Sequence, residues 1–349
     1  VGSPAETFES HLNSLDAAIS YGIKRINGGE IRMLPGTEMD SPEEREKWGI
    51  KTKYRLFEGG AGIYRGELVY ELEETIRQTS TMSEAEMIEL RVLRAMFFGS
   101  VTLGEHWPLI ALLTHKGTRL TEVLRRLVER QDVSPGLARA LHWLRDQAVN
   151  EFFETADDIA GHLAIDENRD ALFGEEAFMK LNFGFTAWLL LHPKDHAAYY
   201  DELGNVLVDM LGGDVASHVI GEILNLCRQR NYLARRLRGE TGTRFEVAAS
   251  PETRAMLEAS EYLGAGSADG ETLSLRIDQV TAGQIDRAVT ARESELSPFI
   301  VSQIMQMFWG RCHLEPDNLA WDGADPGTDR VNAFQKPLGI DAVGSAAAT

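Results

Sequence analysis

Carboxylate and histidine side chains with metal-ligand spacing occur in one acidic stretch of the chain. Glu154, Asp158 and His162 follow one another at intervals of four residues, so a helix would carry them on one face, and Glu151 lies three residues before Glu154. Di-iron sites in helical bundles need a Glu-x-x-His pair on each of two helices, and the sequence has no such pair. We therefore expect a solvated acidic helix face here.

The remaining histidines and the cysteines are too few for a metal centre of their own. His192 and His196 are four residues apart, but the proline between them predicts a turn rather than a helical zinc pair. Cys312 and His313 would supply two ligands where a structural zinc takes four, so we expect Cys312 to be a buried structural thiol. Cys227 is the only other cysteine, which favours a reducing compartment, and the expected location is the cytoplasm.

The chain opens on a turn of the kind that carries site residues in β/α proteins, where chemistry comes from the C-terminal ends of strands. Gly2 is followed by Ser3 at a predicted helix N-cap, Pro4 at the first helical position and Glu6 at the third, which is a capping box. A strand would have to end at the first residue. We therefore expect the chain to begin inside a structural unit.

A second turn closes the next predicted strand. Residues 23–34 are apolar-rich and end in Pro35-Gly36-Thr37, so the order strand, turn, helix, strand predicts a β/α unit of a parallel sheet or barrel. Residues 53–57 predict another strand, and residues 68–79 fit helix or strand equally well. The glycine-rich run 58–62 lacks the Gly-Lys-Ser/Thr ending of a phosphate-binding loop, so we expect a flexible loop over the mouth of the barrel.

The rest of the chain is mainly helical. A second capping box at Ser83 to Glu86 starts a helix, and helical periodicity continues to about residue 240. The predicted fold is mixed α/β and predominantly α-helical. Its four parts are 1–82, the C-terminal end of a partial β/α barrel of the TIM type; 83–240, a helical domain; 241–321, a small α+β region; and 322–349, a disordered tail.

Charge and hydropathy narrow the partners. The 349 residues carry 54 acidic against 35 basic side chains, a formal net charge of −19, which repels phosphate backbones and makes nucleic acid an unlikely partner. We find neither an apolar run of membrane-spanning length nor a signal peptide, so no membrane partner is expected.

Four features in one order carry a resemblance to a known family. The run Val1 to Thr7 (VGSPAET) resembles the turn after the fifth barrel strand of radical S-adenosylmethionine enzymes, and Met33 to Met39 (MLPGTEM) resembles their sixth-strand turn. Trp48 to Arg55 (WGIKTKYR) before a glycine-rich loop, and Glu71 to Ser83 (ELEETIRQTSTMS) before a helix, resemble the subset of that family with an N-terminal cobalamin-binding domain. The resemblance covers roughly the first quarter of the chain.

This resemblance implies a parent enzyme in which a 4Fe-4S cluster, held by a Cys-x3-Cys-x2-Cys loop, reductively cleaves S-adenosylmethionine, while cobalamin supports methyl transfer or related chemistry. Neither the cysteine motif nor an Asp-x-His-x-x-Gly cobalamin signature is present. The implied main partner is therefore the N-terminal part of the same protein, the substrate is unknown, and this chain alone is expected to be inactive.

The residues that the resemblance places at S-adenosylmethionine are those of the two turns. They are Gly2, Ser3, Pro4, Leu34 and Pro35, and we assign no residue of this chain as catalytic or as a metal ligand. An alternative is a non-catalytic helical interaction module with a vestigial β/α unit. A methylthiolating tRNA-modifying enzyme would need a basic C-terminal β-domain, and the helical, acidic C-terminal part disfavours it.

Overall fold

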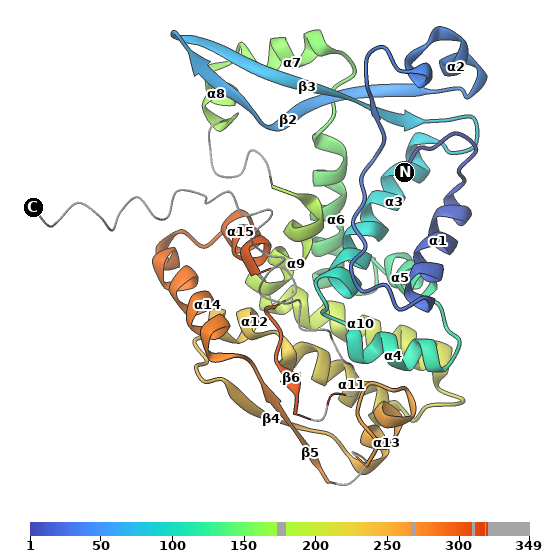
Figure 1. Cartoon of the computed structure of the whole chain (residues 1–349), viewed down its shortest axis with the longest axis vertical. Helices are drawn as coiled ribbons and strands as arrows, with labels where there is room; N and C mark the ends of the chain where they lie inside the picture. The colour runs from blue at the N-terminus through green and yellow to red at the C-terminus, as the bar shows by residue number, and fades with distance from the viewer. Residues whose placement is uncertain (173–178, 267–269, 309–310, 318, 320–349) are drawn as a thin grey trace, which may run out of the picture.

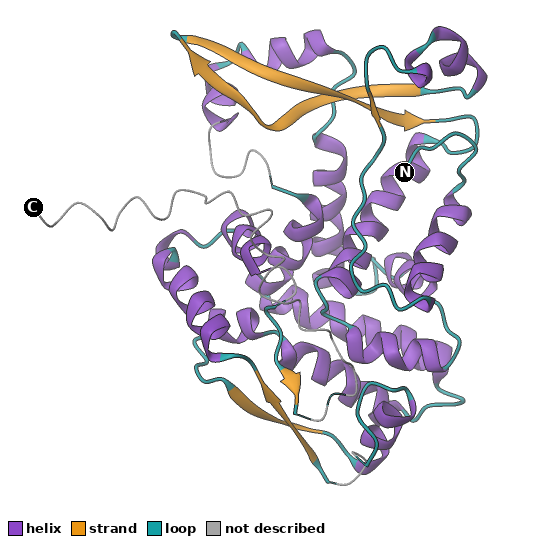
Figure 2. Ribbon diagram, viewed as in Figure 1, coloured by secondary structure: helices purple, strands orange, loops and turns teal. Residues whose placement is uncertain are grey.

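The computed structural model describes residues 1–172, 179–266, 270–308, 311–317 and 319. It confirms a mixed α/β and predominantly helical chain, with 58% helix and 15% strand. One end of the molecule carries a long β-hairpin, helices fill the middle, and a small sheet lies at the other end (Figures 1 and 2). The tail predicted from residue 322 lies outside the described residues.

The helices begin where the sequence offers caps. Ser83 forms the predicted capping box with Glu86, and prolines occupy the first turns of several helices. The α-helices are α1 (Phe8–Ser20), α2 (Pro42–Lys47), α3 (Glu84–Phe97), α4 (Trp107–His115), α5 (Leu120–Glu129), α6 (Pro135–Asn150), α7 (Ala156–Leu163), α8 (Asp166–Leu172), α9 (Leu181–Leu191), α10 (Pro193–Leu211), α11 (Ser217–Arg230), α12 (Tyr232–Leu237), α13 (Pro251–Ala259), α14 (Gln279–Ala291) and α15 (Pro298–Phe308). Short 3-10 turns are η1 (Glu38–Asp40) and η3 (Glu293–Glu295), and η2 (Phe98–Thr102) is a π-helix that continues α3.

The N-terminal sheet has the order β1-β3-β2, and its named strands pair antiparallel. Its strands are β1 (Arg32–Met33), β2 (Lys51–Tyr64) and β3 (Glu67–Gln78). The segment 68–79, left open between helix and strand, is therefore strand. The loop expected at 58–62 is instead part of β2, where the register shifts between Leu56 and Ala61. A bulge accommodates the glycine-rich run inside a strand, because extra residues on one strand need no partner.

One pair of hydrogen bonds departs from the antiparallel pattern. The amino group of Val1 donates to the carbonyl of Gly29 at 2.9 Å, and the amide of Ile31 donates to the carbonyl of Val1 at 2.9 Å. Bonds from one residue to the two neighbours of its partner are those of a parallel ladder. Val1 therefore lies beside Glu30 as a parallel neighbour, with α1 as the connection between them. The strand predicted over 23–34 is much shorter than expected, since only β1 is regular.

The second sheet is also antiparallel, in the order β4-β5-β6. Its strands are β4 (Arg244–Ala248), β5 (Thr272–Arg276) and β6 (Glu315–Pro316), and all three lie within the segment 241–321 predicted as a small α+β region. A single hydrophobic cluster runs from Leu12 in α1 to Leu314 beside β6, so buried side chains connect the ends of the described chain. The outer part of the β2–β3 hairpin packs on a separate small cluster from α7 and α8.

Several helices of the body are rich in apolar residues, and their length and hydropathy bear on whether any of them could cross a membrane. No single helix in the described part of the chain combines the length and the hydropathy that a span requires. The stretch Glu84–Thr102 meets these criteria only together with Trp107–His115, and the two are bent by 97° relative to each other.

Candidate functional sites

The first predicted turn is held closed by its own glutamate. Glu6 Oε2 accepts the backbone amides of Gly2 at 2.8 Å and Ser3 at 3.3 Å, and Glu6 Oε1 lies 2.8 Å from His11 Nδ1. The predicted capping box was wrong: α1 begins at Phe8, and Thr7 is its N-cap, bonded to the amide of Ser10. Ala5 adopts a φ of 64°, which breaks the helical path that Ser3 would have started.

Gly2 is required by the chain itself. Its φ is +93°, and a Cβ at this position would lie 3.2 Å from Ile76 Cγ2 and 3.5 Å from Met87 Cε. A side chain here would be both strained and crowded. The amides of Gly2 and Ser3, which could have held an anionic ligand group, already serve Glu6.

The second predicted turn is open to solvent. Leu34 is 59% exposed and Pro35 is exposed, and Thr37 closes the turn by donating its amide and its hydroxyl to the Leu34 carbonyl at 3.2 and 2.8 Å. Both turns follow the same end of two neighbouring chain segments. No hydrogen bond among the described residues joins them, and Leu34 lies on the order of 13 Å beyond Glu30, the neighbour of Val1, along the strand direction.

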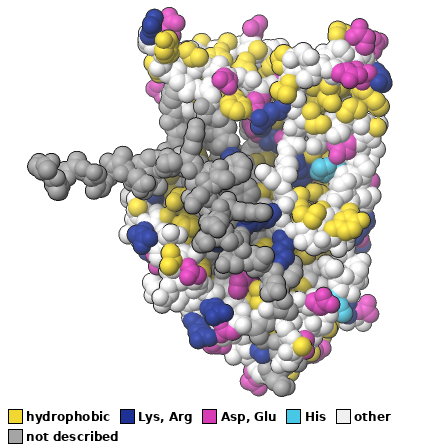
Figure 3. All heavy atoms as spheres, viewed as in Figure 1, with side chains coloured by type: hydrophobic (Ala, Val, Ile, Leu, Met, Phe, Trp, Pro, Cys, Tyr) yellow, Lys and Arg dark blue, Asp and Glu magenta, His cyan; other side chains and the backbone are white. Residues whose placement is uncertain are grey.

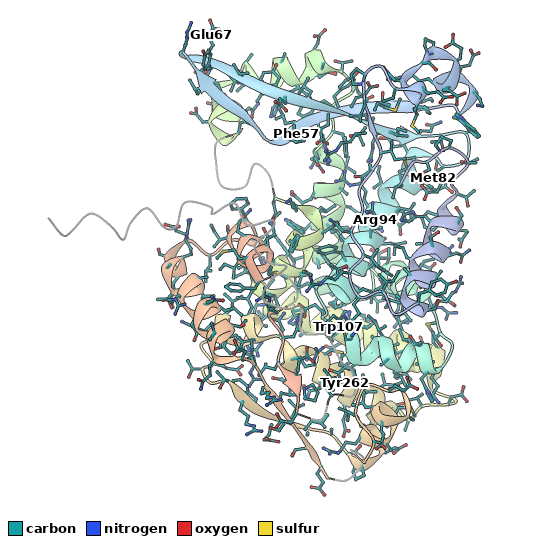
Figure 4. All side chains as sticks on the ribbon, viewed as in Figure 1. Phe57, Glu67, Met82, Arg94, Trp107 and Tyr262 are labelled. Carbon is teal, nitrogen blue, oxygen red and sulfur yellow. The ribbon has the colours of Figure 1, made fainter. Side chains whose placement is uncertain are left out.

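A cavity of about 150 Å³ lies between the N-terminal unit (residues 1–82) and α3. Val1, His11, Gly28 and Arg94 are among the residues that line it. Arg94 reaches from α3 to the carbonyl of Gly28 (Figure 4). His11 Nε2 is buried without a hydrogen-bond partner, and burial lowers the pKa of His11 despite the Glu6 carboxylate beside it.

Buried arginines attach the N-terminal sheet to the helical body. The guanidinium carbons of Arg77, Arg91 and Arg55 lie 4.1, 4.8 and 5.6 Å from the centroid of the Phe152 ring. Arg91 Nε is 3.1 Å from Glu30. Burial would raise the pKa of Glu30, but the charges of Arg91 and other arginines outweigh it and lower this pKa to about 2. The cluster is an ion-pair network whose carboxylates are already matched.

The acidic stretch predicted as one helix face is divided by the fold, so that expectation was wrong. α6 ends at Asn150, Glu151 accepts bonds from Arg55 and Arg91, and Glu154 pairs with Lys53 at 2.7 Å. Two more of its members belong to α7: Asp158 completes the capping box of that helix, and His162 lies in its last turn. The carboxylates are caps and ion-pair partners.

A second cavity, of about 20 Å³, is lined by residues of the π-helix η2, α9 and α10, and this volume is room for about one water. Gly99 allows η2 to approach α9, because a Cβ there would lie 2.7 Å from Thr186 Oγ1. π-helical turns recur at functional sites. The lining residues are Met96, Gly99, Ser100, Glu105, His106, Phe185, Thr186, Leu189, Leu190, His196, Tyr199 and Tyr200.

Hydrogen bonds fix the tautomer of His106 in this second cavity. Ser100 Oγ donates to the carbonyl of Met96 at 2.8 Å, so it accepts from His106 Nδ1, also at 2.8 Å. Nε2 therefore carries the lone pair, and it is buried without a hydrogen-bond partner. Burial lowers the pKa of His106 to about 4, so the ring is neutral at physiological pH.

Glu105 supplies the negative charge of the same cavity. Asn231 Nδ2 donates to its Oε1 at 2.7 Å, and His313 Nε2 lies 3.4 Å from the same oxygen. Burial would raise the pKa of Glu105, but these partners more than offset it and the pKa is lowered. Burial also lowers the pKa of His196 to about 4.

No sequence pattern predicted that these residues lie around a common cavity. His192 does lie at the predicted break between helices, but the proline after it starts α10 and His196 points from that helix to the cavity lining. Cys312 is a buried thiol as expected, and burial raises its pKa. The only local signal in the sequence for this cavity is the adjacent polar pair Glu105-His106, which lies between apolar stretches. Side chains from α9 and α10 line the same cavity, and His313 lies beside Glu105.

The two cysteines of the chain do not match the ligands of the 4Fe-4S cluster that the resemblance implies. Cys227 and Cys312 are both buried, and burial raises the pKa of Cys227 to about 12. Two such thiols do not fit a 4Fe-4S cluster, which takes thiolate ligands from at least three cysteines in the implied family. Among the described residues, no group of three or more His, Cys, Asp or Glu side chains is placed to hold a metal ion.

A scan against protein-family models finds no match for the chain, and a search of curated proteins finds none either. Inferences about function therefore rest on the sequence motifs and on the geometry above.

Proposed function

We propose that the chain is the C-terminal part of a radical S-adenosylmethionine enzyme of the cobalamin-binding type, inactive on its own. The observation that carries the proposal is the parallel-type pairing of Val1 with residues 29–31 across α1. In a β/α barrel, consecutive strands are parallel and joined by a helix. The two motif-bearing turns follow these paired segments, where a barrel places its site.

In this proposal the residues of the chain close and shape one side of a barrel. Gly2, Ser3 and Pro4 would form the wall beside S-adenosylmethionine, with Glu6 holding their turn in shape, and the exposed Leu34 and Pro35 would line the next strand end. The cluster reductively cleaves S-adenosylmethionine in that family. Its ligands, and those of cobalamin, would come from residues outside this chain.

The partial barrel also accounts for the open N-terminal edge. The described residues show one parallel neighbour pair followed by antiparallel strands, whereas a complete barrel has eight parallel strands. The cavity beside Val1 and His11 would then be filled from the N-terminal side. The helical body, from α3 onward, would support the barrel without contributing to the cluster.

The reading frame upstream of Val1 tests this proposal directly. We expect it to continue without a stop and to encode Cys-x3-Cys-x2-Cys. The longer protein, reconstituted without oxygen, should bind iron and sulfide and cleave S-adenosylmethionine, whereas residues 1–349 should do neither. An initiator codon at position 1, or an upstream frame without the cysteine motif, would contradict it.

A second test addresses the turns. In the longer protein, Leu34→Ala should weaken S-adenosylmethionine binding several-fold, since an apolar wall contact is lost. Ile63→Ala, a matched change at a residue that is also 59% exposed but lies on the hairpin, should leave it unchanged. Equal effects of the two substitutions would remove Leu34 from the site.

An interaction module remains the second candidate, because the hairpin exposes apolar side chains. Ile63, Tyr64 and Val69 are 59%, 64% and 53% exposed near its tip. On the face shown in Figure 3, apolar side chains gather at the end of the molecule that carries this hairpin. This candidate predicts that residues 1–349 are monomeric and melt cooperatively without any N-terminal partner.

A further inference from the structure

We propose that the cavity between α1, residues 26–29 and α3 binds a small hydroxy acid in its carboxylate form. Arg94 holds the carboxylate, and His11 accepts a hydrogen bond from the hydroxyl group. Binding by residues 1–349 is independent of the enzyme chemistry suggested above, since neither a cluster nor cobalamin takes part in it. A chain segment that entered this cavity in a longer protein would compete with the ligand.

Arg94 brings to the cavity a positive charge that no carboxylate among the described residues pairs with. Its guanidinium donates to the carbonyl of Gly28, which is a neutral group. The charges of Glu30 and Glu6 act on Arg94, but neither carboxylate lies within ion-pair distance of it. Glu30 is instead 3.1 Å from Arg91 Nε. Burial lowers the pKa of Arg94 more than these carboxylates raise it. Arginine nevertheless stays protonated in proteins, and its planar guanidinium matches a carboxylate, so an anionic ligand group is favoured beside it.

His11 supplies an acceptor to the same cavity. Its Nδ1 lies 2.8 Å from Glu6 Oε1. Burial would raise the pKa of Glu6, but the hydrogen bond from His11 and nearby positive charge outweigh it, so this carboxylate is ionised and only accepts. Nδ1 therefore carries the proton, and Nε2, which is buried without a partner, carries the lone pair. Burial is the main cause that lowers the pKa of His11, and the charge of Arg94 adds to it, so the ring is neutral at physiological pH and Nε2 needs a donor.

The volume and walls of the cavity limit the carbon part of the ligand. Its volume is about 150 Å³. A cavity of this volume holds a molecule about the size of benzene. Leu15, Phe97 and Phe98 are buried side chains of its wall, and Ile26 is a half-buried one. A short alkyl chain would cover these apolar surfaces, so a ligand of roughly six to eight non-hydrogen atoms fits.

Other occupants fit this cavity less well. The charge of Arg94 repels a cation, and the described residues contain no group of three or more His, Cys, Asp or Glu side chains placed to hold a metal ion. An inorganic anion has no apolar part for the walls. Several water molecules have room, since each needs only about 10–15 Å³, and one of them would satisfy His11 Nε2. Water would still leave Arg94 without a counter-ion.

Titration calorimetry and ligand-observed NMR on residues 1–349 test the proposal with sodium 2-hydroxybutanoate, for which we expect saturable binding. Butanoate lacks the hydroxyl group and should bind roughly threefold to tenfold more weakly. The amide 2-hydroxybutanamide has the same shape without the charge and should bind roughly tenfold to hundredfold more weakly. No binding of 2-hydroxybutanoate to the folded chain would overturn the proposal and leave water as the occupant. Equal affinity for the three ligands would overturn it as well.

Two variants assign the two ends of the ligand. Arg94→Met should remove most of the preference for 2-hydroxybutanoate over 2-hydroxybutanamide. Arg145→Met is its matched control and should keep that preference, because Arg145 lies on α6 and does not line the cavity. His11→Phe keeps an aromatic ring without the acceptor, so it should remove the preference for 2-hydroxybutanoate over butanoate. Far-UV circular dichroism and melting check that each variant is folded. A preference that survives its own variant would contradict the role of that residue, and the three ligands on the unmodified chain decide if a variant does not fold.

Val1 also lines the cavity, so the charge of its amino group needs a control. This group donates to the carbonyl of Gly29 at 2.9 Å. A chain with one added glycine before Val1 carries an amide there in place of the ammonium group. We expect its affinity for 2-hydroxybutanoate to change by less than about threefold, because Arg94 holds the carboxylate. Loss of binding in the extended chain would overturn the assignment to Arg94.

Discussion

The hydrogen bonding of polar groups differs between the N-terminal unit, residues 1–82, and the helical body that follows it. In the unit, residues with a sequence signature bond to their own chain, as Glu6 accepts the amides of Gly2 and Ser3 and the amino group of Val1 donates to Gly29. In the body, no motif marks the cavity under η2, yet it holds His106 Nε2 without a partner. The residues with a sequence signature thus have their hydrogen bonds satisfied, while a buried acceptor without a partner lies where the sequence gives no signature.

The largest effect on stability should come from the body. Arg230 has no exposed side-chain surface and donates to the carbonyls of Leu314 and Gly104 at 3.2 Å and to Glu315 at 2.7 Å. Arg230→Met should lower the free energy of unfolding by about 3–5 kcal/mol, because two carbonyls and a carboxylate lose their donor. Urea denaturation measures it.

Arg244→Met is the matched control for this buried pair. Arg244 pairs with Asp317 at the surface and is itself 65% exposed, so its loss should change the free energy of unfolding far less than the loss of Arg230 does. If the two variants lost the same free energy of unfolding, the buried ion pair of Arg230 would be no better shielded from solvent than the surface pair of Arg244.

The two regions should also respond to acid in different pH windows. The folded pKa of His106 is about 4 against 6.5 unfolded, so the unfolded chain binds the extra proton and stability falls as pH drops from 6.5 to 4. The folded pKa of Glu30 is about 2 against 4.5, so its stabilisation is complete above pH 4.5 and is lost as pH falls towards 2. Each contributes about 3 kcal/mol across its window.

Two substitutions assign these windows. His106→Asn should flatten the pH dependence of unfolding between pH 6.5 and 4, and Glu30→Gln should flatten it between 4.5 and 2. Chemical denaturation at a series of pH values measures both. If His106→Asn changed only the lower window, the histidine would be charged in the folded body and the description of the cavity would be wrong.

Local patterns in the sequence predicted the helices better than the sites. The capping box at Ser83 was predicted correctly because a cap depends on only a few neighbouring residues. The box at Ser3 failed, since the positive φ of Ala5 and the contact of Gly2 with Ile76 depend on chain far away in sequence. The glycine-rich run of β2 read as a loop because a bulge is visible only once its partner strand is placed.

The cavity was beyond the reach of such patterns for the same reason. His106 and His196 are ninety residues apart in the chain, and the close approach of α9 to η2 is permitted by a single glycine. Nothing in either local sequence indicates that the other is near. The resemblance, in contrast, follows contiguous motifs, which is why it concerns only the N-terminal unit.

That single glycine gives a prediction of intermediate size. Gly99→Ala should destabilise the body by about 1–3 kcal/mol, because its methyl group would lie 2.7 Å from Thr186 Oγ1 and the side chain of Thr186 would have to shift. Gly221→Ala, in α11 with nothing within 4 Å of its Cβ, should instead stabilise by about 0.5–1 kcal/mol through helix propensity. Thermal unfolding compares the two, and a neutral Gly99→Ala would show that η2 and α9 are loosely packed.

The smallest predicted effect is a difference between two variants, and it concerns the contact that Gly2 makes with Ile76. Gly2 and Gly22 both have positive φ, +93° and +73°, so alanine at either position costs about 1–2 kcal/mol of backbone strain. A Cβ on Gly22 meets nothing within 4 Å, whereas one on Gly2 meets Ile76 at 3.2 Å. The difference between the two variants in urea denaturation therefore isolates the Ile76 contact, and we expect Gly2→Ala to cost several tenths of a kcal/mol more.

The same pair of variants in the longer protein separates packing from ligand binding. If Gly2→Ala weakens S-adenosylmethionine binding in proportion to its cost in the isolated chain, the glycine acts by shaping its turn. If the two variants are equally stable but only Gly2→Ala abolishes binding, the space at Gly2 belongs to a ligand.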